Sequence, residues 1–154
     1  MTTIFPNTAA LAAAKGTTLG QSPWLHIDQA MIDAFAEATG DRQWIHVDPD
    51  RCQRQLGRGT IAHGYLVLSL AARFAGEVYR VEQVDRVINY GLDRVRFVSP
   101  VPAGSDIRAH FRLLETVPRD DGLRITNEVT IELRHAPKPA MIAHTLALFV
   151  PSPK

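Results

Sequence analysis

The feature that most constrains the fold of this chain is a run that is apolar on nearly every helical face, from Gly64 to about Ala75. The run reads Gly-Tyr-Leu-Val-Leu-Ser-Leu-Ala-Ala-Arg-Phe-Ala. A helix of this kind has no wide polar stripe to leave in water, so it is expected to be buried on all sides. The rest of the chain must therefore supply a layer that surrounds one helix.

The second half of the chain has the hydrophobic period of strands. Apolar residues alternate with polar ones from Ile107 to Leu113 and from Ile125 to Leu133, which is typical of half-buried strands. Asp121-Gly122 between them is a hairpin signal. The stretch from Ala140 to Val150 is apolar on both faces and predicts a central strand. Together these patterns predict an α+β fold, with an antiparallel sheet wrapped around a long central apolar helix.

Length and composition predict a single soluble domain over residues 1–154. With 45% hydrophobic residues, the chain can build one core but not two ordinary ones. A net charge of +1 argues against a broad face for nucleic acid or a membrane surface. Cys52 is the only cysteine, so no intrachain disulfide can form. No stretch reaches the roughly 18 apolar residues of a membrane span, and we expect a cytoplasmic protein.

Two short helices are predicted in the first third of the chain. Asp28 has the character of an N-cap, and Gly40 that of the residue that ends the helix it starts. Asp48-Pro49 is a second helix start, which leads to Gly57. The connection between the two helices is the place where irregular backbone can aim side chains at one point.

That connection carries a carboxylate and an imidazole, Asp41 and His46, five residues apart. Such a pair can orient a bound water and move its proton. Taken singly, Asp41 is a typical turn residue and His46 a typical packed histidine. Their spacing, together with the later His63-Gly64, favours a catalytic role.

Several motifs together resemble a known family. Gly-Asp-x-x-x-Ile-His-x-Asp at residues 40–48, Ala62-His-Gly at the start of the apolar helix, Asn89-Tyr-Gly-Leu-Asp-Arg-Val-Arg-Phe97 and Pro100-Val-Pro-Ala-Gly104 resemble the MaoC-like (R)-specific enoyl-CoA hydratases, particularly their NodN-like members. The resemblance runs from about Trp24 to Phe149. It implies a hot-dog fold, a homodimer and an acyl-CoA substrate.

Hydration of an enoyl thioester needs a base near the water, a proton for C2, and a donor for the oxygen that gains charge. We expect Asp41 and His46 to handle the water and the protons. The backbone N–H of Gly64, at the positive end of a buried helix, would hold the oxygen. Gly64 can also be a glycine that simply lets the helix approach the sheet, and His63 is expected to position that turn.

Other groups have less direct expectations. Asp41, His46, Asp48 and His63 could be metal ligands, but they lack the paired spacing of zinc sites, and we expect no metal and no cofactor. Arg94 and Arg96 alternate with apolar residues and could bind phosphate from one strand face, or only face solvent. The family pattern has Asn-Pro where this chain has Gln43-Trp44. We expect Trp44 either to wall the acyl pocket or simply to pack the loop.

The function predicted is reversible, (R)-specific hydration of a trans-2-enoyl-CoA. Two alternatives stay open from the sequence. One is a hot-dog acyl-CoA thioesterase, which attacks the carbonyl carbon of the same ligand. The other is a noncatalytic acyl-binding accessory protein of the nodulation type.

Overall fold

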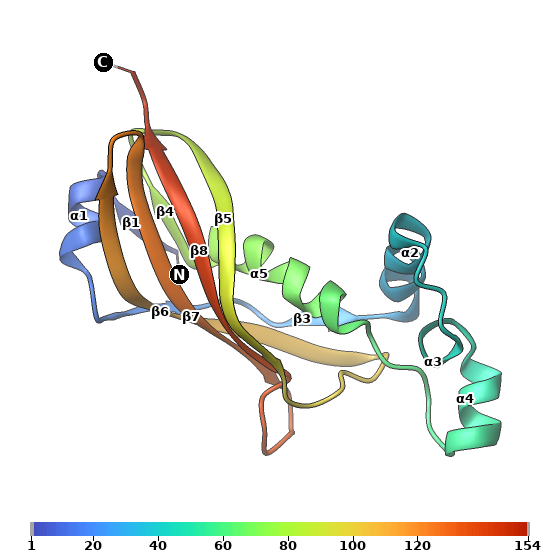
Figure 1. The fold of residues 1–154 in the computed structure, drawn as a ribbon. Coiled ribbons are helices and arrows are strands. Elements are labelled where there is room, and N and C mark those ends of the chain that lie inside the picture. The colour runs from blue at the N-terminus through green and yellow to red at the C-terminus, as the bar shows by residue number, and fades with distance from the viewer. Residues whose placement is uncertain (1, 154) are drawn as a thin grey trace.

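The computed structural model describes residues 2–153. A six-stranded antiparallel sheet curves over one side of helix α5 (Gly64–Val78), the apolar run of the sequence (Figure 1). The strands lie in the order β2, β6, β7, β8, β5, and β3 also pairs with β6. Their bounds are β2 Thr18–Gln21, β3 Leu25–Ile27, β5 Val84–Phe97, β6 Ser105–Arg119, β7 Gly122–Leu133 and β8 Met141–Pro151. The predicted hot-dog arrangement of antiparallel sheet and central helix is confirmed.

The remaining elements lie at the two ends of this body. At one end a short parallel pair, β1 (Thr3–Phe5) and β4 (Tyr79–Val81), lies beside α1 (Thr8–Ala13). At the other end three helices form a small lobe beyond the amino terminus of α5 (Figure 1). They are α2 Gln29–Thr39, α3 Trp44–Val47 and α4 Pro49–Leu56. Within residues 2–153, every helix is too short or too polar to cross a membrane.

The caps expected from the sequence hold this lobe together. The Asp28 side chain accepts a hydrogen bond from the N–H of Met31, and Gly40 ends α2 with a left-handed φ of 77°. Asp48 caps α4 in the same way, with Pro49 in its first turn. A side-chain cap is worth about 1 kcal/mol. These local signals therefore fix where the connection between α2 and α4 begins and ends.

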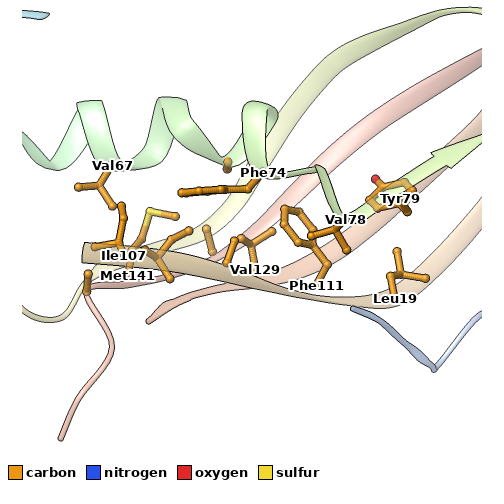
Figure 2. Packing of buried hydrophobic residues seen from close by; sticks show 14 of the residues in the cluster. Leu19, Val67, Phe74, Val78, Tyr79, Ile107, Phe111, Val129 and Met141 are labelled. Atoms are coloured by element: carbon orange, nitrogen blue, oxygen red, sulfur yellow. The ribbon is translucent and has the colours of Figure 1, made fainter. Parts of the chain in front are cut away.

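The core lies between the inner face of the sheet and one face of α5. Alternate residues of β6 and β7 point toward the helix, as the period of two predicts, and Met141 of β8 joins them (Figure 2). A fully buried side chain of this size contributes about 1.5–3 kcal/mol. The contributing residues include Val67, Phe74, Val78, Ile107, Phe111, Val129 and Met141. Tyr79 closes the far end of the core, where burial raises the pKa of its phenol to about 12.

The expectation that α5 is buried on all sides is wrong for this chain alone. Tyr65 is 69% exposed, and Ser69 and Ala72 on the same face are also exposed. The sheet covers only one side of α5, and its edge strand β5 is itself exposed along nearly its whole length. A cavity of about 930 Å³ lies between this face of α5 and β5.

The predicted hairpin between β6 and β7 forms one residue earlier than expected. Arg119 pairs with Gly122, so the tight loop is Asp120-Asp121. Gly122 has a φ of 152°, and a Cβ there would lie 2.1 Å from the carbonyl oxygen of Phe149. Only glycine fits this approach of β7 to β8, so the glycine serves sheet packing as well as the turn.

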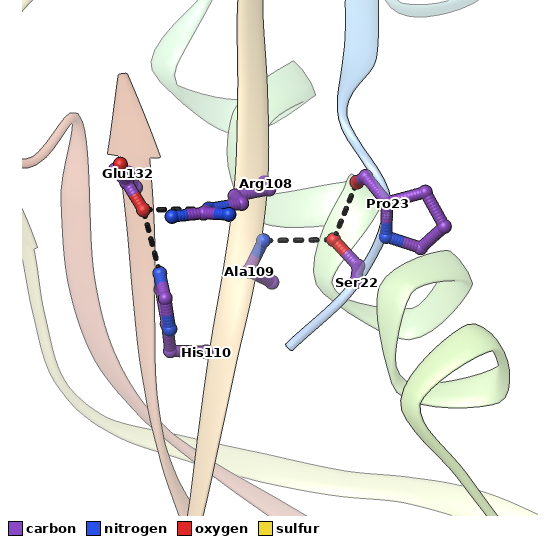
Figure 3. Close-up of polar contacts among 6 residues, drawn as sticks. All are labelled: Ser22, Pro23, Arg108, Ala109, His110 and Glu132. Carbon is purple, nitrogen blue, oxygen red and sulfur yellow. Dashed lines mark hydrogen bonds and ion pairs between the residues drawn. The ribbon is translucent and has the colours of Figure 1, made fainter. Parts of the chain in front are cut away.

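Polar contacts on β6 join the sheet to the segment that precedes the lobe. The Ser22 hydroxyl accepts a hydrogen bond from the N–H of Ala109 at 2.9 Å and donates to the carbonyl of Pro23 (Figure 3). On the outer face, Glu132 accepts from Arg108 and His110, both at 2.7 Å. The chain leading into α2 is thus attached to the sheet by its side chains as well as by strand pairing.

Candidate active site

Three of the polar residues singled out by the sequence meet where the lobe joins α5. A carboxylate oxygen of Asp41 and one ring nitrogen from each of His46 and His63 lie within 4.8 Å of one another. Asp41 comes from the end of α2, His46 from α3, and His63 from the residue before α5. Two connections of the chain therefore converge on one point.

His46 lies on a single helical turn that the sequence did not predict. Trp44–Val47 forms α3, where an irregular connection was expected. The ring is 8% exposed, and its Nδ1 lies 2.7 Å from the carbonyl oxygen of Ile61. A carbonyl can only accept, so Nδ1 carries the proton. The neutral ring then has an unprotonated Nε2, as a general base requires.

Asp41 is aimed by the helix end that precedes it. The left-handed conformation of Gly40 turns the chain out of α2, and the Asp41 side chain remains exposed. Its backbone carbonyl accepts a hydrogen bond from Nε2 of His63 at 2.8 Å. The backbone at Asp41 is therefore fixed by a buried group. One oxygen of the exposed carboxylate accepts a long hydrogen bond from the N–H of Gln43 at 3.4 Å, and the carboxylate can still meet a water or a ligand.

His63 is almost completely buried, at 2% exposed. Its ring stacks on that of His46, with centroids 3.8 Å apart and planes inclined by 26°. Phe35 of α2 packs against its other side, with centroids 5.0 Å apart. His63 thus connects α2, the Asp41 backbone and His46.

The amino terminus of α5 has unpaired donors. His63 is the N-cap residue, but its side chain makes no capping bond. Within the described residues, the first N–H of α5 to donate to a backbone carbonyl is that of Val67, whose partner is the carbonyl of His63. The N–H groups of the first turn, beginning with Gly64, are left for another acceptor. The helix dipole makes this a favourable place for negative charge.

His46 and Gly64 line the same cavity, which has a volume of about 280 Å³. Its other walls come from the segment after Ile61, from α5, and from the end of β5. They are Ile61, Ala62, Val67, Phe97, Val98, Ser99, Pro100, Val101 and Ala140. A base and an anion-stabilising helix end therefore face one largely apolar space, which is the arrangement of a small-molecule site.

Phe97 is a residue of this site that the sequence analysis did not single out. A Cβ built on Gly64 would lie 3.1 Å from two atoms of its ring. Both readings of Gly64 are therefore compatible with the structure: it permits a close approach to β5, and it presents an N–H to the cavity. Phe97 ends one of the motifs that carry the family resemblance, but neighbouring residues in the sequence do not show that its ring reaches α5.

Asp41, His46 and His63 are also the residues that could hold a metal ion. Each imidazole uses one nitrogen to donate to a backbone carbonyl, as metal-bound histidines do. The lone pairs of imidazoles lie in the ring planes, however, and these planes are nearly parallel. Lone pairs of two stacked rings run side by side and are poorly aimed at a single point about 2 Å from both nitrogens, which a shared metal would require. The geometry thus fits proton transfer better than metal binding.

The structure places the other candidate substrate ligands outside this cavity. Trp44 is half-buried, and the guanidinium of Arg51 lies 4.4 Å above its ring. At Arg94 the strand bulges, because Asp93 pairs with His144 but Arg96 pairs with Ile142. Arg94 has a φ of 54°. The strict alternation that predicted Arg94 and Arg96 on one face is therefore interrupted.

Comparisons with known sequences agree with one another. Residues 10–133 match the family described as "MaoC like domain". The chain is 43% identical over 147 residues to 3-hydroxyacyl-thioester dehydratase Z of Mycobacterium tuberculosis, covering 95% of this chain and 97% of that protein. It is 44% identical over 138 residues to nodulation protein N of Rhizobium leguminosarum, covering 86% of this chain and 84% of that protein.

Solved structures are similar in fold. A protein of Archaeoglobus fulgius described as a monoamine oxidase regulatory protein has a TM-score of 0.77 at 22% identity, over 99% of both chains. The unliganded R-hydratase of Pseudomonas aeruginosa has a TM-score of 0.73 at 22% identity, over 90% of this chain and 83% of that one. At these identities the likeness establishes the shared fold alone.

Proposed function

Since the chain belongs to the MaoC-like dehydratase family, we propose that it catalyses the reversible hydration of a trans-2-enoyl-CoA to the (R)-3-hydroxyacyl-CoA. The observation that carries the proposal is the shared cavity of about 280 Å³. It brings the His46 ring and the uncapped start of α5 at Gly64 into one space, with the Asp41 carboxylate beside His46. These are the groups that addition of water to a conjugated thioester requires.

In the hydration direction, Asp41 and His46 hold one water against C3 of the substrate. His46 Nε2 or the Asp41 carboxylate takes a proton from the water as its oxygen bonds to C3. The electron pair of the C2–C3 double bond moves toward the thioester, whose oxygen gains negative charge. The N–H of Gly64 stabilises that oxygen, and the positive end of α5 reinforces the effect.

Protonation of C2 then completes the reaction. The proton taken from the water is returned to C2 by the same pair of residues, so atoms and charge balance without any other reactant. Dehydration runs the same steps in reverse. Since the water and both catalytic groups lie on one side of the bound chain, one face of C3 is attacked and a single enantiomer forms.

The test is an assay with crotonyl-CoA that follows loss of the enoyl thioester absorbance, with a thiol reagent in a parallel sample. A hydratase consumes the enoyl group and releases no free CoA. Release of CoA at the same rate would instead identify a thioesterase. Saturable binding without turnover of either kind would identify an accessory protein, and both of these outcomes contradict the proposal.

The proposal includes a homodimer. Strand β5 pairs only with β8, so its outer edge is unpaired within the described residues, and an open edge invites pairing with another chain. Large apolar side chains are exposed along β5 and beside it on α5: Tyr65, Val87, Ile88, Tyr90, Leu92 and Phe97. A second copy would cover both the edge and this surface. Light scattering that gives the monomer mass of 17.0 kDa at micromolar concentrations would contradict it.

Two finer assignments belong to the same proposal. Arg94 and Arg96 are both exposed and form no ion pair within residues 2–153, so they are available to CoA phosphates. If they serve in this way, glutamine at either position raises KM for a CoA thioester but not for a pantetheine thioester. A single buried, unpaired cysteine is typical of a cytoplasmic protein, which is where we assign this activity.

A further inference from the structure

Gln29, the first residue of α2, joins three parts of the site lobe through one side-chain amide. Its Nε2 donates to the backbone carbonyl of His46 at 2.7 Å and to Asp33 Oδ1 at 2.8 Å. Its Oε1 accepts a hydrogen bond from the Thr60 hydroxyl. A primary amide has two N–H donors and one carbonyl acceptor, so every hydrogen of this group is used.

The two long-range partners of Gln29 belong to the two segments that form the site. His46 lies on α3. Thr60 precedes Ile61, whose carbonyl accepts a hydrogen bond from the His46 ring. The same segment continues to Gly64. The two segments also contact each other directly, since the N–H of Ile61 donates to the carbonyl of Ile45 at 3.1 Å. The amide of Gln29 adds a side-chain link between the segment that carries the base and the segment that leads to the oxyanion donor.

The Thr60 end of this link is anchored. Thr60 is 2% exposed, and its carbonyl accepts from the N–H of Ala103 at 2.9 Å. Ala62, two residues later, donates to the carbonyl of Val101 at 2.8 Å. The segment that leads to α5 is thus hydrogen-bonded to the connection between β5 and β6. Gln29 links α3 to this anchored segment.

We infer that Gln29, acting through Thr60 and the His46 carbonyl, is a positioning residue that sets the spacing between His46 and the amino terminus of α5. The inference rests on the proposed hydratase function. Without the amide, α3 keeps its contact with Ile61 but loses the link from its own backbone to Thr60. A misplacement of reacting groups by about 1 Å can lower a rate by about 10²-fold.

The test compares variants of the full-length chain. Gln29→Met removes every hydrogen bond of the amide at similar size, and Thr60→Val removes only the hydroxyl. Thr60→Ser retains the hydroxyl and serves as the conservative rescue. Asp33→Ala is the matched control, because it removes the local bond within α2 and leaves both long-range bonds in place. Gln29→Glu, which keeps the acceptor for Thr60 but loses the donor to His46, is available if Gln29→Met fails to fold.

In the crotonyl-CoA assay, Gln29→Met and Thr60→Val should lower kcat by roughly 10²-fold with KM within about threefold of the original. The double variant should be scarcely worse than either one, while Thr60→Ser and Asp33→Ala should keep nearly full kcat. A lower melting temperature with kcat unchanged, or a raised KM alone, would overturn the inference.

A second readout does not depend on turnover. In protein labelled with ¹⁵N-histidine, the Nδ1 resonance of His46 should move in Gln29→Met and remain in place in Asp33→Ala. If the original chain has no hydratase activity, the proposed function fails while this spectrum still reports on the link. If the His46 resonance is unchanged in Gln29→Met, the positioning inference fails even when the original chain is an active hydratase.

Discussion

The imidazole of His63 stacks on that of His46, with ring centroids 3.8 Å apart, while its Nε2 donates to the backbone carbonyl of Asp41 at 2.8 Å. One buried residue thus contacts both members of the proposed catalytic pair. The other ring nitrogen of His63, Nδ1, is buried and has no hydrogen-bond partner in the described part of the protein.

Replacement of His63 should therefore lower activity through position. His63→Leu removes the part-buried bond to the Asp41 carbonyl, which should lower the free energy of unfolding by about 0.5–1.5 kcal/mol. His63→Gln offers an amide N–H to the same carbonyl and should recover much of this loss. Thermal unfolding and kcat are the measurements. Equal damage by leucine and glutamine would show that the hydrogen bond to Asp41 is not the reason for this histidine.

Gly64→Ala should separate the two readings of this glycine. The backbone N–H remains, but the new methyl lies 3.1 Å from the ring of Phe97, which is 48% exposed and able to shift. Overpacking of about 1–3 kcal/mol in the cavity corresponds to a loss of roughly 5–160-fold in kcat/KM.

The matched background for this variant is Phe97→Ala. If the contact with the ring causes the loss, adding Gly64→Ala to Phe97→Ala should change kcat/KM little. A full loss in that background would show that the α5 terminus tolerates no side chain for another reason, such as direct contact with the thioester.

Trp44→Ala should lower kcat in the same proportion for short and long enoyl chains. The ring packs under the Arg51 guanidinium at 4.4 Å and lies outside the cavity lining, which supports the loop-packing reading of the sequence. Trp24→Ala is the matched control. The guanidinium groups of Arg108 and Arg134 also lie 4.4 Å from the Trp24 ring, and Trp24 does not line the cavity. A shift toward longer chains in Trp44→Ala would instead restore the hypothesis that this ring walls the acyl pocket.

Stability should fall with acid partly through Glu132. The hydrogen bond from Arg108 is the largest of the effects that hold the pKa of this carboxyl below its ordinary value of 4.5, and His110 adds to it (Figure 3). A carboxyl whose folded pKa is lowered stabilises the fold above its unfolded pKa and loses that contribution as pH falls through the folded pKa. Glu132→Gln should therefore be less stable than the original at neutral pH.

The difference between the two proteins should shrink as pH falls from 4.5 toward the lower folded pKa, because Glu132 takes up a proton first in the unfolded state and then in the folded state. Urea unfolding at several pH values measures it. A difference that stays constant over this range would mean that glutamine perturbs the packing of the sheet surface, and that the charge of Glu132 is not the cause.

Local signals in the sequence were sufficient where the structure depends on neighbours along the chain. Asp28 and Gly40 bound α2, and Asp48-Pro49 starts α4, because caps act within one turn. The alternation in β6 and β7 predicts which side chains are buried, because successive residues of a strand point to opposite faces. The proximity of Asp41 and His46 was expected from their place on the connection between two helices, and Gly64 was expected at the start of the buried helix.

The features that were missed depend on contacts between distant segments. Phe97 lies over Gly64 only because β5 returns beside α5, and the stacking of His46 on His63 requires two connections to meet. The bulge at Arg94 interrupts an alternation that is regular in the letters. One face of α5 is apolar in sequence but exposed in this chain, and the sequence does not show which surface would cover it. In each case the residue or surface that determines the structure lies far away in the sequence.

The central claim is that Asp41 and His46 act as one unit on a single water, and steady-state hydration of crotonyl-CoA by four proteins tests it most directly: the original, Asp41→Asn, His46→Gln and the double variant. Each single change should lower kcat by about 10²–10⁴-fold, and the double variant should be scarcely worse, because residues that act as a unit are not additive. A stereospecific 3-hydroxyacyl-CoA dehydrogenase should detect only the (R) product. Full activity in Asp41→Asn, multiplicative losses in the double variant, or formation of the (S) product would contradict the account.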